Sequence, residues 1–245
     1  MANLATRTIG DLATEVPGAT RLFEKLGIDY CCGGSSSLEA ACSIAGLSLE
    51  EVSLSLEQAK ETEKQPNASK DWRQGRLSEL ISHIMTTHHV FTREELARLN
   101  PLFDKVCSVH GKNHPELFTI CKSFGVLSRE LTLHMHKEEQ VLFPYILRME
   151  QEMLAHRAVP SPPFGTVQNP VRMMMKEHEK AGDLLVQIRK GSSNFTVPAD
   201  GCSSFRSLYQ SLAALEEDLH QHIHLENNLL FPRAVEMEGS AQNFR

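Results

Sequence analysis

The chain has 245 residues, of which 41% are hydrophobic, so it can bury one sizeable domain together with a smaller one. Its net charge of −6 combines both signs, which argues against a surface for nucleic acid or for an anionic membrane. No apolar run approaches the roughly 18 residues of a spanning helix, and the N-terminus does not resemble a signal peptide. The six cysteines are too sparse for a disulfide framework, so we expect a reducing, cytoplasmic location.

Residues 1–60 predict a small domain of short helices. Thr8, three residues before Asp11, is typical of a capped helix start, and Gly27 is placed to end the following helix. A serine at position 36 or 37 precedes another helical segment. The loop between these helices reads IDYCCGG, and residues 61–75, which are polar and without an apolar period, predict a linker.

Four long helical patterns follow between residues 76 and 240, and alternating strand patterns are absent. We therefore predict an all-α chain whose C-terminal domain is a four-helix bundle. Pro101 is expected to kink or end the first long helix, because proline removes a backbone hydrogen bond. The first pattern opens with Leu77, Leu80, Ile81, Ile84 and Met85, and the others cover Phe118–Leu147, Met173–Ile188 and Phe205–Val235.

One motif occurs twice, 88 positions apart. Residues 134–146 read HMHKEEQVLFPYI, and residues 222–234 read HIHLENNLLFPRA. Each copy places a histidine four residues before a glutamate, so that both side chains project from one helix face. Each is preceded by a helical pattern that carries another histidine. This arrangement predicts a two-metal site inside the bundle, with ligands from His134, Glu138, His222 and Glu226.

The apolar neighbours of these motifs indicate that the pairs face inward. A buried carboxylate without compensation costs several kcal/mol, so two related ones favour a bound cation. His178 lies on the apolar face of its own helix and is a further candidate ligand. In the first helix two neighbours compete: helical phase favours His88, whereas the repeat spacing favours His89.

Other polar residues near the motifs have two readings each. His136 and His224 lie about 200° around the helix from the ligand candidates and are expected on the solvent side or beside ligands. Glu139, Asn227 and Asn228 either hydrogen-bond the ligands or face solvent. The vicinal pair Cys31–Cys32 either fills a turn or supplies functional thiols, because a following helix N-terminus would favour thiolate.

The chain resembles the repair-of-iron-centres (RIC) family of hemerythrin-like di-iron proteins, over essentially its whole length. The strings that carry the resemblance are TIGDLATEVPGATRLFEKLGIDYCCGG, KDW, HMHKEEQVLFP, EHEKAG and HIHLENNLLFPRA. The resemblance implies a hemerythrin-like bundle at residues 76–240 and an N-terminal domain characterised by DYCCGG. It also selects the second histidine of the doublet, so that the implied metal ligands are His89, His134, Glu138, His178, His222 and Glu226.

The implied cofactor is a pair of non-haem iron ions, bridged by Glu138, Glu226 and an oxo or hydroxo group. Four imidazoles and two carboxylates suit iron or manganese better than they suit thiolate-seeking metals. The resemblance further implies repair of iron–sulfur clusters damaged by oxidative or nitrosative stress, by iron donation in one version. Nitric oxide reduction and reversible sensing of O2 or NO are the alternatives, so whether the protein is an enzyme stays open.

The partners implied are damaged iron–sulfur proteins and small ligands such as NO or O2, without nucleic acid or membrane, and with a homodimer as one assembly. Cys31 and Cys32 are the candidate redox, metal-handling or docking thiols.

Overall fold

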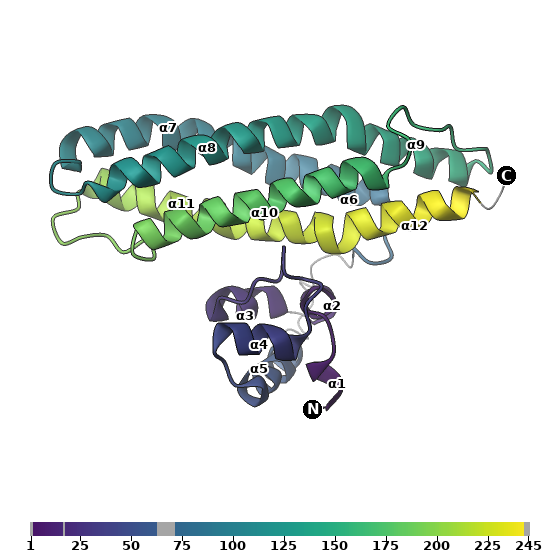
Figure 1. The fold of residues 1–245 in the computed structure, drawn as a ribbon, viewed down its shortest axis with the longest axis horizontal. Coiled ribbons are helices and arrows are strands. Elements are labelled where there is room, and N and C mark those ends of the chain that lie inside the picture. Colours follow the sequence, from purple (N-terminus) through teal and green to yellow (C-terminus); the bar gives the residue numbers. More distant parts are fainter. Residues whose placement is uncertain (1, 17, 63–71, 243–245) are drawn as a thin grey trace. The chain divides into compact units, whose positions relative to one another are not determined.

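The structure, a computed structural model, describes residues 2–16, 18–62 and 72–242 (Figure 1). Throughout these residues the regular structure is helical. One isolated antiparallel β-bridge, between Thr8 and Ser37, is also present in the described residues. This confirms the predicted all-α class. None of the helices in this described part is long and apolar enough to cross a membrane. Most of the predicted linker, residues 63–71, lies outside the described residues, and the predicted domain limits stay predictions.

In the described residues before position 63, five helices form the N-terminal region, and local capping explains several of their ends. The Thr8 hydroxyl accepts a hydrogen bond from the Asp11 N–H at 3.1 Å, and Ser37 caps the fourth helix in the same way. Gly27 ends the third helix with a φ of 67°, a left-handed conformation that favours glycine. These predicted caps are confirmed. The helices are α1 (Ala2–Ala5), α2 (Ile9–Glu15), α3 (Ala19–Leu26), α4 (Leu38–Ala45) and α5 (Leu49–Thr62).

In the described residues 72–242 the chain forms four long helical segments, three of which contain a short π-helix (η). The segments are α6 (Leu77–His83), η1 (Ile84–His89) and α7 (Val90–His110); α8 (Glu116–Lys137), η2 (Glu138–Leu142) and α9 (Phe143–Leu154); α10 (Gln168–Gly191); and α11 (Ser203–Leu225), η3 (Glu226–Leu230) and α12 (Phe231–Gln242). They overlap the four predicted patterns, with longer bounds, and confirm the predicted helical bundle.

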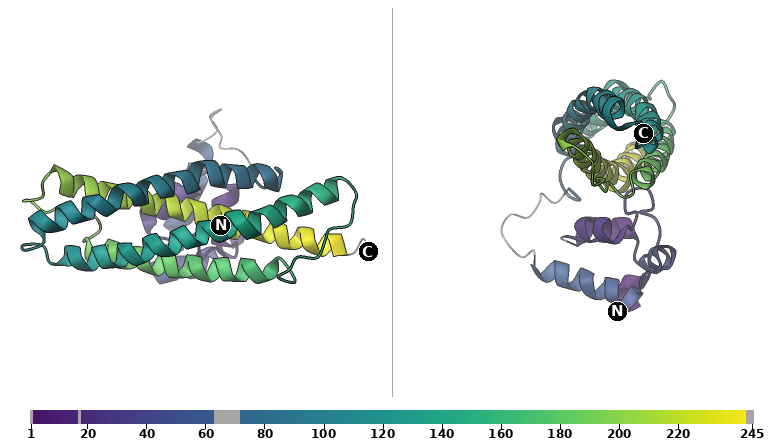
Figure 2. Two further views of the ribbon diagram at one scale, coloured as in Figure 1. Left: turned by 90° about the horizontal axis from the view of Figure 1, so that it is seen from above. Right: turned by 90° about the vertical axis from the view of Figure 1, so that its left-hand side faces the viewer.

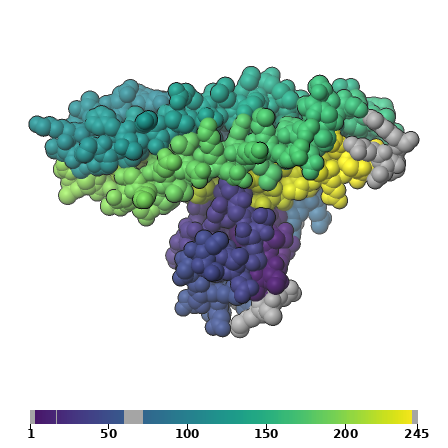
Figure 3. Space-filling view, viewed as in Figure 1, coloured from purple at the N-terminus to yellow at the C-terminus, as the bar shows by residue number. Residues whose placement is uncertain are grey.

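The chain divides into two compact units, Ile81–Leu219 and Met1–Leu80 with His220–Arg245. In the first of these, α7, α8, α10 and α11 run side by side around a shared core (Figure 2). Figure 3 shows the green surface of α10 against the teal surface of α8, the pair with the most extensive contact. The core includes Phe103 and Phe124, whose ring centroids lie 4.9 Å apart. In the second unit, the N-terminal helices have their own core around Phe23, Leu12 and Leu38.

Pro101 does not end the first long helix, so the predicted early end is wrong. Helix α7 continues through Pro101 to His110. The Asn100 side-chain amide donates a hydrogen bond to the Leu96 carbonyl at 2.8 Å, which supplies a local bond in the turn that proline interrupts. Leu99 and Phe103 are buried on either side, so core packing outweighs the cost of the proline.

Candidate metal centre

The three π-helices lie at predicted ligands. His89 ends η1, Glu138 begins η2 and Glu226 begins η3. A π-helical turn is wider than an α-helical turn, and such turns are rare and frequent at functional sites. Sequence periodicity missed them, since the apolar pattern does not distinguish one extra residue per turn over so short a stretch.

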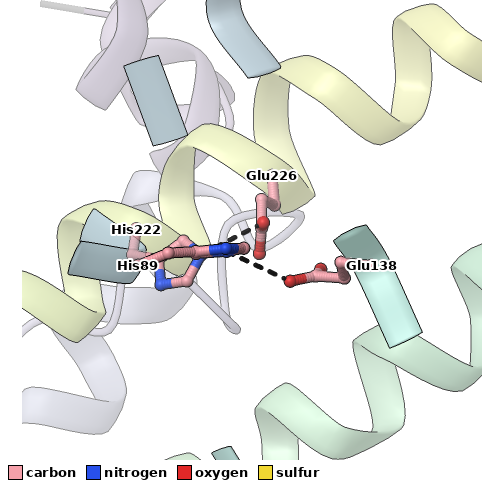
Figure 4. A group of neighbouring side chains, drawn as sticks. All are labelled: His89, Glu138, His222 and Glu226. Carbon is pink, nitrogen blue, oxygen red and sulfur yellow. Dashed lines mark hydrogen bonds and ion pairs between the residues drawn. The ribbon is translucent and has the colours of Figure 1, made fainter. Parts of the chain in front are cut away.

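All six predicted ligands are buried, and their ligand atoms fall into two overlapping groups. The first contains His89, Glu138, His222 and Glu226, with one ligand atom from each residue lying within 4.8 Å of the others. Figure 4 shows the two imidazoles and the two carboxylates of this group turned toward one another. The second group, at the same spacing, contains His134 and His178 with the same two glutamates. Both glutamates therefore belong to both groups.

The shorter distances show how the side chains point. The Nε2 atoms of His134 and His178 lie 2.9 Å apart, and Nε2 of His134 lies 3.3 Å from a Glu138 oxygen. Nε2 of His89 approaches the other Glu138 oxygen at 3.4 Å. Nε2 of His222 lies 3.1 Å from a Glu226 oxygen, so each of the four imidazoles directs the same ring nitrogen into the cluster.

Two acidic residues hold the opposite ring nitrogens. Nδ1 of His89 lies 2.6 Å from Glu139, which also pairs with Arg93 at 2.5 Å. Nδ1 of His134 lies 2.9 Å from Glu177. An imidazole that donates its Nδ1 proton to a carboxylate presents the Nε2 lone pair to a metal. Glu139 therefore takes the first of its two expected roles.

The neighbours of Glu177 keep its carboxyl group ionised. Hydrogen bonds from His134 and from Lys137 lower the pKa of this carboxyl to about 2. It is therefore an ionised acceptor at neutral pH.

Three other histidines next to the ligand candidates lie in different environments. His88 hydrogen-bonds Asp218 at 2.9 Å, so the structure places His89 rather than His88 in the cluster. His136 is exposed, as expected. The solvent-side expectation for His224 is wrong: it is buried 5.4 Å from the ring of Tyr30 and hydrogen-bonds Asn228. Burial lowers the pKa of His224 to about 4, so this imidazole is neutral.

The donor set fits a metal. Two carboxylates buried in one place repel each other, and a bound cation offsets this repulsion. Imidazole nitrogen with carboxylate oxygen is a combination typical of iron, and the sulfur atoms that softer metals require are absent from both groups. The cluster is therefore a metal-binding site by its chemistry.

Comparison with known proteins agrees with this chemistry. Residues 80–234 match the Hemerythrin HHE cation binding domain, and residues 5–60 match the ScdA_N domain of unknown function (DUF542). A probable iron-sulfur cluster repair protein of Haemophilus influenzae is 36% identical over 233 residues, 95% of this chain and 98% of that protein. The iron-sulfur cluster repair protein YtfE of Escherichia coli O157:H7 is 37% identical, over 93% of this chain and 96% of its own. YtfE of Cronobacter sakazakii is 38% identical, over 93% and 95%.

The chain belongs to this family of hemerythrin-domain proteins. The hemerythrin match spans all six predicted ligands, and the N-terminal match contains Cys31 and Cys32. The resemblance inferred from the motifs is thereby confirmed.

The N-terminal thiols have a different environment from the one expected. Cys31 is buried and Cys32 half-buried, and their sulfur atoms lie 3.9 Å apart. The hydrogen bond to Cys32, together with burial, raises the pKa of Cys31 well above its ordinary value. The expectation that a helix N-terminus favours thiolate is therefore wrong for Cys31, because α4 begins only at Leu38 and the carboxylate of Asp29 lies nearer.

Proposed function

We propose that this protein is a di-iron protein that takes part in the repair of iron–sulfur clusters damaged by oxidative or nitrosative stress. The observation that carries the proposal is the overlap of the two ligand groups, in which two glutamates are common to both. Relatives that match nearly the whole chain are named iron-sulfur cluster repair proteins, which supports the same activity here.

In this proposal His89 and His222 hold one iron, and His134 and His178 hold the other. Glu138 and Glu226, which belong to both ligand groups, would bridge the two ions together with an oxo or hydroxo group. The iron pair, when bound, supplies exchangeable iron and a place for a small ligand such as NO or O2. The protein's own part is to keep four imidazole lone pairs and two carboxylates directed at one buried place.

Iron donation to a damaged cluster is the form of repair that the donor set favours. Iron–sulfur clusters hold their iron by sulfur ligands, which bind iron more covalently than carboxylate oxygen and imidazole nitrogen do. Iron can therefore pass from this donor set to a damaged cluster. The targets are then iron–sulfur proteins. We place the activity in the cytoplasm, where reduced thiols such as the six free cysteines persist.

A matched pair of variants tests the site. His134→Gln removes a proposed ligand, whereas His136→Gln changes an exposed histidine in the same motif. We expect two irons per chain and oxo-bridge absorption in the unchanged protein and in His136→Gln. In His134→Gln, metal analysis and Mössbauer spectra should detect loss of the paired iron signal. Equal iron pairs in both variants would contradict the ligand assignment.

The same variants separate repair from the alternatives. Incubation with an iron–sulfur protein whose cluster NO has damaged should restore that cluster with the unchanged protein and His136→Gln, but not with His134→Gln. Stoichiometric formation of N2O without restoration would identify nitric oxide reduction instead. Reversible NO or O2 binding without either outcome would identify a sensor.

A further inference from the structure

A second cluster of metal-ligating atoms lies in the loop between α3 and α4. It consists of Asp29, Cys31 and Cys32, whose ligand atoms all lie within 4.8 Å of one another. The Cys31 sulfur is 3.3 Å from a carboxylate oxygen of Asp29 and 3.9 Å from the Cys32 sulfur. The cluster belongs to the unit that contains the N-terminal helices, and none of its members is a ligand in the buried centre.

The spacing of the sulfur atoms suits one shared cation. Two thiolates bound to a tetrahedral metal at about 2.3 Å each have their sulfur atoms about 3.8 Å apart. The observed 3.9 Å matches this value, and it is almost twice the roughly 2.0 Å of a disulfide bond. The spacing therefore allows both sulfur atoms to bind one ion without rearrangement of the pair.

The loop is held in this shape by backbone contacts. One carboxylate oxygen of Asp29 accepts the N–H groups of Cys31 at 3.1 Å and Cys32 at 2.9 Å. A side chain at Gly33 would approach the Asp29 carbonyl to 2.7 Å, so this close turn requires glycine. The acid and both thiols are consequently fixed on one short turn.

Two asparagines anchor the other side of the loop. Asn227 donates to the Cys31 carbonyl at 3.2 Å, and Asn228 donates to the Tyr30 carbonyl at 3.0 Å. Both asparagines follow Glu226 directly in the chain. The thiol loop is thereby attached to the π-helix η3, which begins at a proposed iron ligand.

We propose that Asp29, Cys31 and Cys32 form a second, exchangeable site for a divalent cation that accepts thiolate ligands, such as Fe2+ or Zn2+. The buried Cys31 closes the inner side of the site, whereas the exposed Asp29 and half-buried Cys32 admit the ion from solvent. Binding forms two metal–sulfur bonds and releases the two thiol protons to water. Three protein ligands leave a tetrahedral position for a ligand from solvent or from a target protein. The use of this site in iron delivery rests on the function proposed above.

Cobalt is a direct probe, because Co2+ bound to thiolate absorbs in the near ultraviolet whereas Co2+ bound by oxygen and nitrogen alone does not. We expect anaerobic titration of the iron-loaded, reduced full chain with Co2+ to develop this band at one equivalent, with the iron content unchanged. Cys31→Ser and Cys32→Ser should each weaken the band, and the double variant should lose it. Asp29→Asn keeps the oxygen that accepts the two N–H groups and should bind Co2+ more weakly while retaining the band.

Cys202→Ser is the matched control, since Cys202 is the exposed thiol with the lowered pKa and is the natural competitor for added metal. The Cys202→Ser variant should develop the same band as the unchanged protein when Co2+ is added. Absence of the band in the unchanged chain, or its loss in Cys202→Ser, would overturn the proposed site.

Iron transfer separates this site from the proposed function. If the Asp29–Cys31–Cys32 site takes part in delivery, the double cysteine variant should keep both buried irons. It should also deliver iron to the damaged cluster more slowly than the unchanged protein. An unchanged delivery rate would remove the site's role in delivery. Failure of the unchanged protein to restore any cluster would instead overturn the proposed function, whatever the cobalt titration gives.

Discussion

The imidazoles of the buried centre divide their two nitrogens between separate tasks. In His89 and His134 the Nδ1 atom is held by a carboxylate, and Nε2 faces the cluster. Each of these carboxylates is in turn paired with a cation, Arg93 for Glu139 and Lys137 for Glu177. The ring orientation is thus fixed before metal arrives, which lowers the entropic cost of binding.

This arrangement makes Glu177 the most informative positioning residue. Glu177→Gln keeps the side-chain shape but removes the charge that holds the Nδ1 proton of His134. We expect the affinity for iron to fall about 10–100-fold, the range typical of such partners of ligating histidines, so that a chelator removes iron faster. The helical circular dichroism should not change. Glu179→Gln, an exposed change two residues away, is the control, and equal rates of iron loss in the two variants would contradict the role.

At the scale of helices, the sequence was sufficient where the signal is local or periodic. Apolar spacing predicted the four long helices, and the capping at Thr8 and Ser37 follows from side chains three residues before the bonded N–H. The π-helices could not be predicted in this way, because they depend on which side chains the neighbouring helices accept. Periodicity alone therefore left His88 and His89 as alternatives, and the family resemblance selected His89, which ends η1.

The N-terminus of α11 creates a second reactive environment, at Cys202. The Phe205 N–H and the His110 side chain, 3.2 Å away, lower the pKa of this thiol to about 7. Since a lowered thiol pKa means more thiolate at a given pH, alkylation by iodoacetamide should reach half its maximal rate near pH 7. His110→Gln should move the midpoint upward. Cys107 provides an internal control, because burial raises the pKa of its thiol to about 11. A midpoint near pH 9 for the alkylation of Cys202 would refute the prediction.

On the scale of the whole chain, the two ends of the sequence fold as one unit. The described parts of residues 1–80 and 220–245 cluster together, and contacts such as Glu24 with His220 at 2.8 Å join segments 196 positions apart. The repeat made His136 and His224 equivalent in the sequence, but only His224 meets Tyr30 and becomes buried. A partner so distant in the chain leaves no periodic signal, so this difference could not be predicted from the motif.

The contact of Gly34 with Asn228 allows this long-range packing to be measured. A Cβ at Gly34 would overlap the Asn228 side chain, including its Oδ1 atom. A Cβ at Gly10 would approach the same Oδ1 atom to 2.7 Å. Gly34→Ala should therefore destabilise the protein by about 1–3 kcal/mol, as overpacking usually does. Asn228→Ala should cost about 1 kcal/mol for each net hydrogen bond that it removes, including the one to Tyr30.

The double variant, Gly34→Ala with Asn228→Ala, shows whether the two losses of stability have one cause. Because Asn228→Ala removes the atoms that Gly34→Ala would strike, the pair should be less destabilised than the sum of the single changes. Urea unfolding of the four proteins in the cycle measures this coupling. Gly46→Ala is the control, because Gly46 is a loop glycine with open space around it. Its φ of 67° means that alanine brings backbone strain, but the stability that Gly46→Ala loses should simply add to the stability that Asn228→Ala loses, without coupling. Strict additivity of Gly34→Ala with Asn228→Ala would mean that the N-terminal loop does not rest on η3 in solution.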